Sequence, residues 1–221
     1  MRQLNFISIA APLSHLATLS GLFALFMFLI HRNKLTIPIR VLYLLTVYSC
    51  LADLASFVLQ KFRMNNFFIF HITSLVEIFC FCYFFYFILE NDKIKRSVMI
   101  ALVVLLFIEL MDAFYIDGLE NPNALFSLFE AISFNIFSLL FFYQLMKNIP
   151  QKNILNYSLF WINSAILIYF AGNLFLFIFS KILLNEHTIP FSHIWMINSF
   201  LYLVYNIFIS IGVWKSSKSI L

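Results

Sequence analysis

Seven apolar stretches follow one another along this chain of 221 residues, separated by short polar breaks. A helix needs about 20 mostly apolar residues to cross the hydrocarbon core of a bilayer. The stretches cover residues 6–30, 39–60, 67–89, 97–116, 123–146, 155–180 and 191–214. A soluble domain needs about 50 residues or more, so none of the breaks can hold one. The sequence therefore predicts an all-α fold, a single integral membrane seven-helix bundle over residues 1–221.

The composition excludes the common soluble classes. Hydrophobic residues make up 63% of the chain and charged residues 11%, with a mean hydropathy of +0.95. Ordinary soluble domains have about 45–50% apolar and about 25% charged residues. A soluble enzyme, a nucleic-acid-binding domain and a disordered chain are thereby excluded. The net charge of +4 comes from basic residues between the apolar stretches, so we expect the lipid bilayer, and no nucleic acid, as a partner.

The basic residues are unequally divided between the two sides of the predicted bundle. Four lie on the side of the N-terminus: Arg2, Lys61, Arg63 and Lys181. Ten lie on the opposite side: Arg32, Lys34, Arg40, Lys93, Lys95, Arg96, Lys147, Lys152, Lys215 and Lys218. Short loops rich in Lys and Arg stay in the cytoplasm. We predict a multi-pass protein with its N-terminus outside and its C-terminus in the cytoplasm.

A weak internal similarity favours a repeat. Asp53-Leu54 stands eight residues before Lys61, and Asn173-Leu174 stands eight residues before Lys181. His71-Ile72 and His193-Ile194 then follow in the next stretches. This pattern predicts a parallel three-plus-one-plus-three repeat of the kind found in SWEET-type sugar transporters.

Five carboxyl groups fall inside the predicted spans, where a charge at a helix centre costs about 2.5–3.5 kcal/mol on insertion scales. They are Asp53, Glu77, Glu109, Asp112 and Glu130. None lies clearly in the inner half of its span, which indicates a polar pocket that opens to the outside. The candidate ligand-binding residues are Asp53, His71, Glu77, Glu109, Glu130, Asn173 and Asn198.

Two pairings follow from spacing and depth. Asp53 and His71 lie at similar depths on helices joined by a short break, so we expect them to pair. An Asp–His pair can bind a metal, relay protons or satisfy its own hydrogen bonds. With Glu77, these two residues are the candidate metal ligands. Glu109 and Asp112 are three residues apart, which places them on one helix face.

Other polar residues have simpler interpretations. Structural hydrogen bonds between helices are expected for four asparagines, Asn135, Asn163, Asn198 and Asn206. The cysteines, Cys50, Cys80 and Cys82, have no disulfide or zinc-finger spacing. Residues 191–214 contain no Lys, so we expect no retinal, and no other cofactor is indicated.

Three segments, 70–79, 160–175 and 195–206, carry a resemblance. They resemble an uncharacterised family of small bacterial seven-helix membrane proteins, a unit that is also similar to the membrane module of some sensor histidine kinases. The resemblance implies a bacterial cytoplasmic membrane. It also implies that His71, Glu77, Asn173, Asn198 and Asn206 occupy the polar positions of the family. Because no kinase sequence follows residue 214, a signal would pass to a separate cytoplasmic partner.

Three functions remain open. The leading hypothesis is a sensor or receptor-like protein that binds a small ligand, an ion or a proton in the outward pocket. The second is a small-solute or proton-coupled transporter, which needs a path to the inside. The third is a metal-dependent membrane hydrolase that uses His71, Asp53 and Glu77. Binding is favoured over catalysis.

Overall fold

The structure, a computed structural model, describes the backbone of residues 2–116, 118–121, 123–148, 153–185 and 191–218. Within these ranges side chains are described from residue 12 onward, except at 124, 177–185, 191–195 and 218. Seven helices in this part of the chain are long and apolar enough to cross a membrane. They are α1 (Arg2–His31), α2 (Ile37–Lys61), α3 (Phe67–Ile88), α4 (Asp92–Met111), α5 (Ala124–Lys147), α6 (Ser158–Asn185) and α7 (Phe191–Lys218). The prediction of an all-helical protein with seven spans is confirmed.

A capping side chain fixes the beginning of α4, and a π-helical turn follows its end. The helix begins at Asp92, earlier than the predicted residue 97, because the Asn91 side chain accepts a hydrogen bond from the Lys93 backbone N–H at 2.9 Å. The negative charge of Asp92 in the first turn also complements the helix dipole. At its other end α4 continues directly into a π-helical turn, η2 (Asp112–Ile116).

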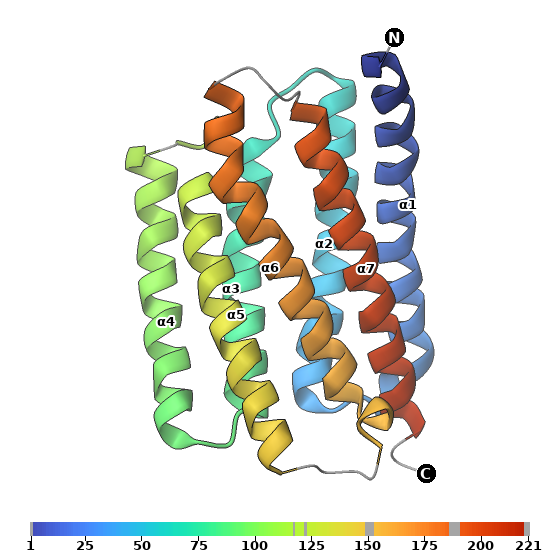
Figure 1. Cartoon of the computed structure of the whole chain (residues 1–221), viewed down its shortest axis with the longest axis vertical. Coiled ribbons are helices and arrows are strands. Elements are labelled where there is room, and N and C mark those ends of the chain that lie inside the picture. Colours follow the sequence, from blue (N-terminus) through green and yellow to red (C-terminus); the bar gives the residue numbers. More distant parts are fainter. Residues whose placement is uncertain (1, 117, 122, 149–152, 186–190, 219–221) are drawn as a thin grey trace.

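The helices form a closed ring in chain order (Figure 1). Each helix packs against the next one, and α7 packs against α1 to close the ring. The α6–α7, α1–α7 and α5–α6 interfaces are the most extensive, whereas α4 has a small contact with α5. The α2–α3 and α4–α5 connections lie at the end of the bundle where α1 begins, uppermost in Figure 1. We call this the predicted outer end.

Phenylalanine rings fill the centre of the ring. The buried Phe134 of α5 lies with its ring centroid 5.1 Å from those of Phe81 and Phe170, on α3 and α6. Phe81 and Phe170 meet edge to face at 5.3 Å, an arrangement that aromatic pairs prefer. The outward faces instead show large apolar side chains such as Val103 and Phe107, about two-thirds exposed at 65% and 64%. This distribution fits a bundle surrounded by lipid.

Polar bonds join the better-packed half of the ring. Asn163 of α6 donates its amide N–H to the Ser138 carbonyl of α5 at 3.0 Å. Asn206 of α7 donates to the Ser20 hydroxyl of α1 at 3.1 Å. The structural roles expected for these two asparagines are confirmed. Hydrogen bonds of this kind hold helices together where lipid removes the hydrophobic driving force.

Gly212 allows α6 and α7 to approach closely. A Cβ atom at this position would lie 2.5 Å from Cγ1 of Ile162 and 3.2 Å from the backbone oxygen of Ser158. The Ser158 hydroxyl also donates to the Gly212 carbonyl at 2.7 Å. Only a residue without a side chain fits against α6 here.

Candidate functional site

A buried histidine–carboxylate pair joins α3 to α4 near the predicted outer end. Nδ1 of His71 lies 2.9 Å from Oε1 of Glu109. Both side chains are almost completely buried, with 3% and 1% of their surfaces exposed. His71 is placed by the first turns of α3 and Glu109 by the last turn of α4. Two residues 38 positions apart in the chain therefore form one ionisable unit.

The second nitrogen of the same ring holds the α4–α5 connection. Nε2 of His71 lies 3.2 Å from the carbonyl oxygens of both Gly118 and Asn121. Gly118 adopts a positive φ of 73°, a conformation that glycine reaches without strain. Asn65, from the α2–α3 connection, donates to the Glu120 carbonyl at 3.0 Å on the same turn. His71 thus links α3, α4 and this turn through one ring.

The π-helical turn η2 follows directly after the pair. It begins at Asp112, whose carbonyl oxygen accepts a hydrogen bond from the Gly118 N–H at 3.1 Å. The Asp112 side chain is fully buried and interacts electrostatically with Glu109. The expectation that these two carboxyls share a face is confirmed. Single π turns occur often at functional sites because the extra residue redirects a side chain.

The expected pairing of Asp53 with His71 is wrong. Both ring nitrogens of His71 are engaged by Glu109, Gly118 and Asn121. Asp53 is half-buried on α2. It interacts electrostatically with Cys50 and Tyr202 instead. Similar depth on adjacent helices did not bring the two side chains together, because contact also requires that both helices turn the right face inward.

Glu130 interacts both with the outer His71–Glu109 pair and with an acid deeper in the bundle. This α5 side chain is 4% exposed, and it interacts electrostatically with both Glu109 and Glu77. Its Oε1 atom is buried without a hydrogen-bond partner among the described residues. Glu109, Glu130 and Glu77 therefore form a series of acids that influence one another inside the membrane.

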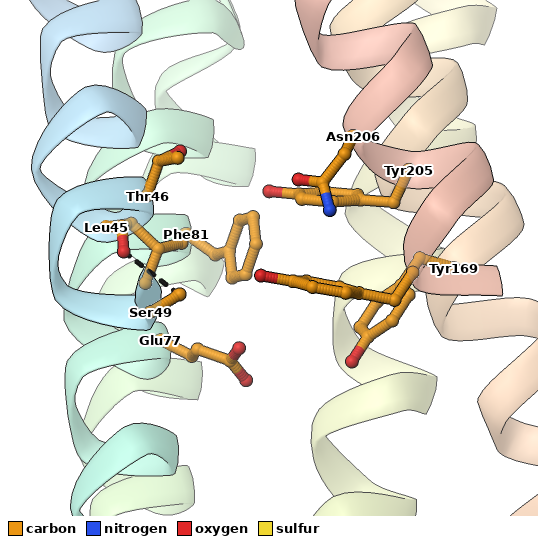
Figure 2. A pocket seen from close by; sticks show the side chains of 9 residues that line it. Leu45, Thr46, Ser49, Glu77, Phe81, Tyr169, Tyr205 and Asn206 are labelled. Carbon is orange, nitrogen blue, oxygen red and sulfur yellow. Dashed lines mark hydrogen bonds between the residues drawn. The ribbon is translucent and has the colours of Figure 1, made fainter. Parts of the chain in front are cut away.

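Glu77 lines a small cavity between four helices (Figure 2). The cavity has a volume of about 20 Å³, enough for one water molecule or a small ion. Pockets for organic ligands are about 300–1,000 Å³. In Figure 2 the Glu77 carboxyl extends from α3 toward the side of the cavity from which Tyr169 and Tyr205 come. The lining residues are Leu45, Thr46, Ser49, Glu77, Phe81, Tyr169, Tyr202, Tyr205 and Asn206.

Sequence reasoning missed the three tyrosines of this cavity. Tyr202 and Tyr205 stack with ring planes 10° apart and centroids separated by 6.3 Å. The Tyr169 ring lies 5.3 Å from that of Tyr205. The spacing of three between Tyr202 and Tyr205 is a usable signal, since it places both on one face of α7. This spacing is hard to distinguish among the many aromatic residues of the chain.

Two further candidates lie elsewhere. Asn173 is buried on α6 and Asn198 is half-buried on α7. Neither lines the cavity at Glu77. Across the side chains that the structure describes, no three His, Cys, Asp or Glu residues form a group that could hold a metal ion. Within that part of the chain, His71, Asp53 and Glu77 are therefore not gathered into a metal centre.

Comparison of the chain with protein families, with curated proteins and with solved structures found no match.

Proposed function

We propose that this multi-pass membrane protein is a proton-responsive sensor, with the His71–Glu109 pair as its switch. The observation that carries the proposal is the contact of both His71 ring nitrogens with acceptors on two other segments. Such a ring can hold these segments together only in certain protonation states. Histidine is also the side chain whose charge changes most readily near neutral pH.

Proton counting defines the switch. Carbonyl oxygens only accept hydrogen bonds, so Nε2, which faces two of them, must carry a proton. The contact between Nδ1 and Oε1 requires one more proton, held either by the ring or by Glu109. If that proton leaves, the Nδ1 lone pair faces a carboxylate at 2.9 Å, and the contact becomes repulsive.

The direction of the response follows from this count. The joined arrangement of α3 and α4 contains the shared proton, so it is favoured at lower pH and lost as the pH rises. Repulsion at Nδ1 would displace the ring and thereby weaken the contacts of Nε2 with the Gly118 and Asn121 carbonyls. Such a change between two packings is the kind of event that a partner protein can detect.

At the Glu77 cavity the geometry favours a proton or small ion over an organic ligand, because this cavity measures only about 20 Å³. It also favours sensing over transport. Beyond Glu77 toward the predicted inner end, the described helices carry one acid, Asp92, and it lies in the first turn of α4. The series of interacting acids thus runs from the predicted outer end to Glu77 and does not continue to the inner end.

The proposal also includes the orientation of the protein and the membrane in which it lies. The distribution of Lys and Arg supports an N-terminus outside and a basic cytoplasmic face. The resemblance noted for segments 70–79, 160–175 and 195–206 supports a bacterial cytoplasmic membrane and a role in signalling. The three-plus-one-plus-three repeat stays a hypothesis within this picture.

Glu109→Gln tests the switch, because a glutamine amide can donate to Nδ1 at any pH. In the wild type, we expect hydrogen–deuterium exchange of the backbone at 112–121 to accelerate as the pH rises. The lost charge-assisted bond is worth about 1.5–3 kcal/mol, or about 10- to 100-fold in the protection factor. Glu109→Gln should keep its protection throughout the series.

Glu120→Gln is the matched control, because Glu120 lies exposed on the same turn and accepts the Asn65 hydrogen bond through its backbone oxygen. It should follow the wild type after correction for the intrinsic pH dependence of exchange. A wild type whose protection does not change with pH, or a Glu109→Gln variant that loses protection as the wild type does, would refute the proposed switch.

A further inference from the structure

We infer that the cavity at Glu77 is a binding site for a small monovalent cation, with Na⁺ as the first candidate. The cavity lies between α2, α3, α6 and α7, and its single carboxyl comes from Glu77. No described residue hydrogen-bonds that carboxyl. The inference concerns a different site from the His71–Glu109 pair and does not depend on the proposed switch.

The two aliphatic hydroxyl groups of the cavity wall already donate hydrogen bonds within their own helix. The Thr46 hydroxyl donates to the Leu42 carbonyl of its own helix at 2.8 Å. The Ser49 hydroxyl donates to the Leu45 carbonyl at 3.0 Å, a bond drawn in Figure 2. Each hydroxyl has one hydrogen, so both oxygens present only lone pairs to any further neighbour. With the Glu77 carboxyl they give the α2–α3 side of the cavity wall oxygen atoms that can accept a cation.

Aromatic rings complete the wall. Tyr169, Tyr202 and Tyr205 line the cavity, and in Figure 2 Tyr169 and Tyr205 extend from the helices opposite Glu77. No Lys or Arg lines the cavity, so the wall itself supplies no positive charge to balance the carboxylate. A bound cation would balance it directly.

Charge and size select the class of cation. Calcium takes about 6–8 oxygen ligands, usually with several carboxylates, and magnesium keeps several of its waters. One carboxylate and about 20 Å³ do not meet either requirement. An organic ammonium ion is too large for the same space. A monovalent ion that sheds its water fits both the charge and the volume.

Binding would connect opposite parts of the ring. The ligand oxygens come from α2 and α3, whereas the tyrosines come from α6 and α7. In the described residues, α2 and α3 have their main contacts with ring neighbours and not with α6 or α7. An ion in the cavity would therefore resist separation of these two halves and stabilise the bundle.

The test compares salts at constant pH and ionic strength. The unfolding temperature of the purified full chain in detergent is measured while choline chloride is replaced by sodium, potassium or ammonium chloride. Binding to the folded state alone raises this temperature by mass action. We expect sodium chloride to raise it for the wild type, and Glu77→Gln to abolish the increase. Isothermal titration with sodium chloride should give the same apparent Kd.

Two serine variants keep the test valid if Glu77→Gln does not fold. Ser49→Ala removes one ligand oxygen and should weaken Na⁺ binding about tenfold, the equivalent of one hydrogen bond to a charged group. Ser133→Ala is its matched control, because Ser133 makes the same bond one turn back in its helix, at 2.8 Å, but does not line the cavity. Its Na⁺ response should equal that of the wild type.

The outcome separates this inference from the proposed function. Glu109 does not line the cavity, so Glu109→Gln leaves the cavity wall in place and should keep the Na⁺ response. Equal unfolding temperatures in sodium, potassium, ammonium and choline chloride would overturn the cation site, as would an undiminished Na⁺ response in Glu77→Gln or Ser49→Ala. The pH-dependent exchange at 112–121 is measured in choline chloride, so it tests the switch independently.

Discussion

Replacement of His71 by alanine is expected to destabilise the bundle by about 3–5 kcal/mol, the usual effect of removing one partner of a buried ionic pair. The substitution leaves the Glu109 carboxyl buried at 1% exposure without the partner of its Oε1 atom. The carbonyls of Gly118 and Asn121 lose a donor as well. Unfolding by SDS titration in mixed micelles, followed by far-ultraviolet circular dichroism, measures the difference.

A double variant distinguishes the loss of a partner from the loss of volume. His71→Leu with Glu109→Leu replaces the whole pair by apolar groups, which is often neutral or stabilising. We expect it to be clearly more stable than His71→Ala. His31→Ala is the matched control, since His31 bonds only to the Met27 carbonyl of its own helix at 2.9 Å. A His71→Ala variant as stable as His31→Ala would show that the pair does not hold α3 to α4.

Gly212→Val is expected to separate α6 from α7 and to cost about 1–3 kcal/mol, as overpacking of a tight interface does. The new Cβ would meet Cγ1 of Ile162 at 2.5 Å and the Ser158 backbone oxygen at 3.2 Å. The side chain can adjust, but the backbone oxygen belongs to the first turn of α6 and moves only with the helix. The same SDS titration reports the loss.

The clash predicts a specific rescue. Ile162→Ala removes the nearest obstacle, so the double variant with Gly212→Val should lose less stability than the two single changes combined. Gly21→Ala is the control, because a Cβ there meets no atom closer than 3.4 Å, an ordinary contact. It should be tolerated. Additive effects of Gly212→Val and Ile162→Ala would contradict the proposed contact.

The spans were predictable because lipid imposes one rule along the whole chain. The predicted stretch 67–89 and the helix Phe67–Ile88 agree closely, since Asn65 and Asn66 precede it and Glu90 follows it. The rule fails at charged ends, where α4 begins at Asp92 because of the Asn91 cap. Hydropathy alone does not register a capped first turn.

The site was predictable only as a list of residues. Buried acids such as Glu109 and Glu130 are recognisable in the sequence, because a carboxyl inside a span is costly and usually has a function. Their partners depend on how far each helix is rotated about its axis, and this information is not contained in the depth of a residue. His71 therefore paired with α4 and not with Asp53. Its two carbonyl partners lie on a turn whose shape depends on Gly118, and no side-chain pattern indicates them.

The closed ring has a consequence for biogenesis. Helices enter the membrane in chain order, but the ring closes only when α7 packs against both α6 and α1. Until then Ser20 lacks the Asn206 amide, and the Glu77 carboxyl lacks the wall formed by Tyr202 and Tyr205. A nascent chain with six inserted helices would present polar groups toward lipid. Closure of the ring by α7 is therefore the step that removes these polar groups from lipid.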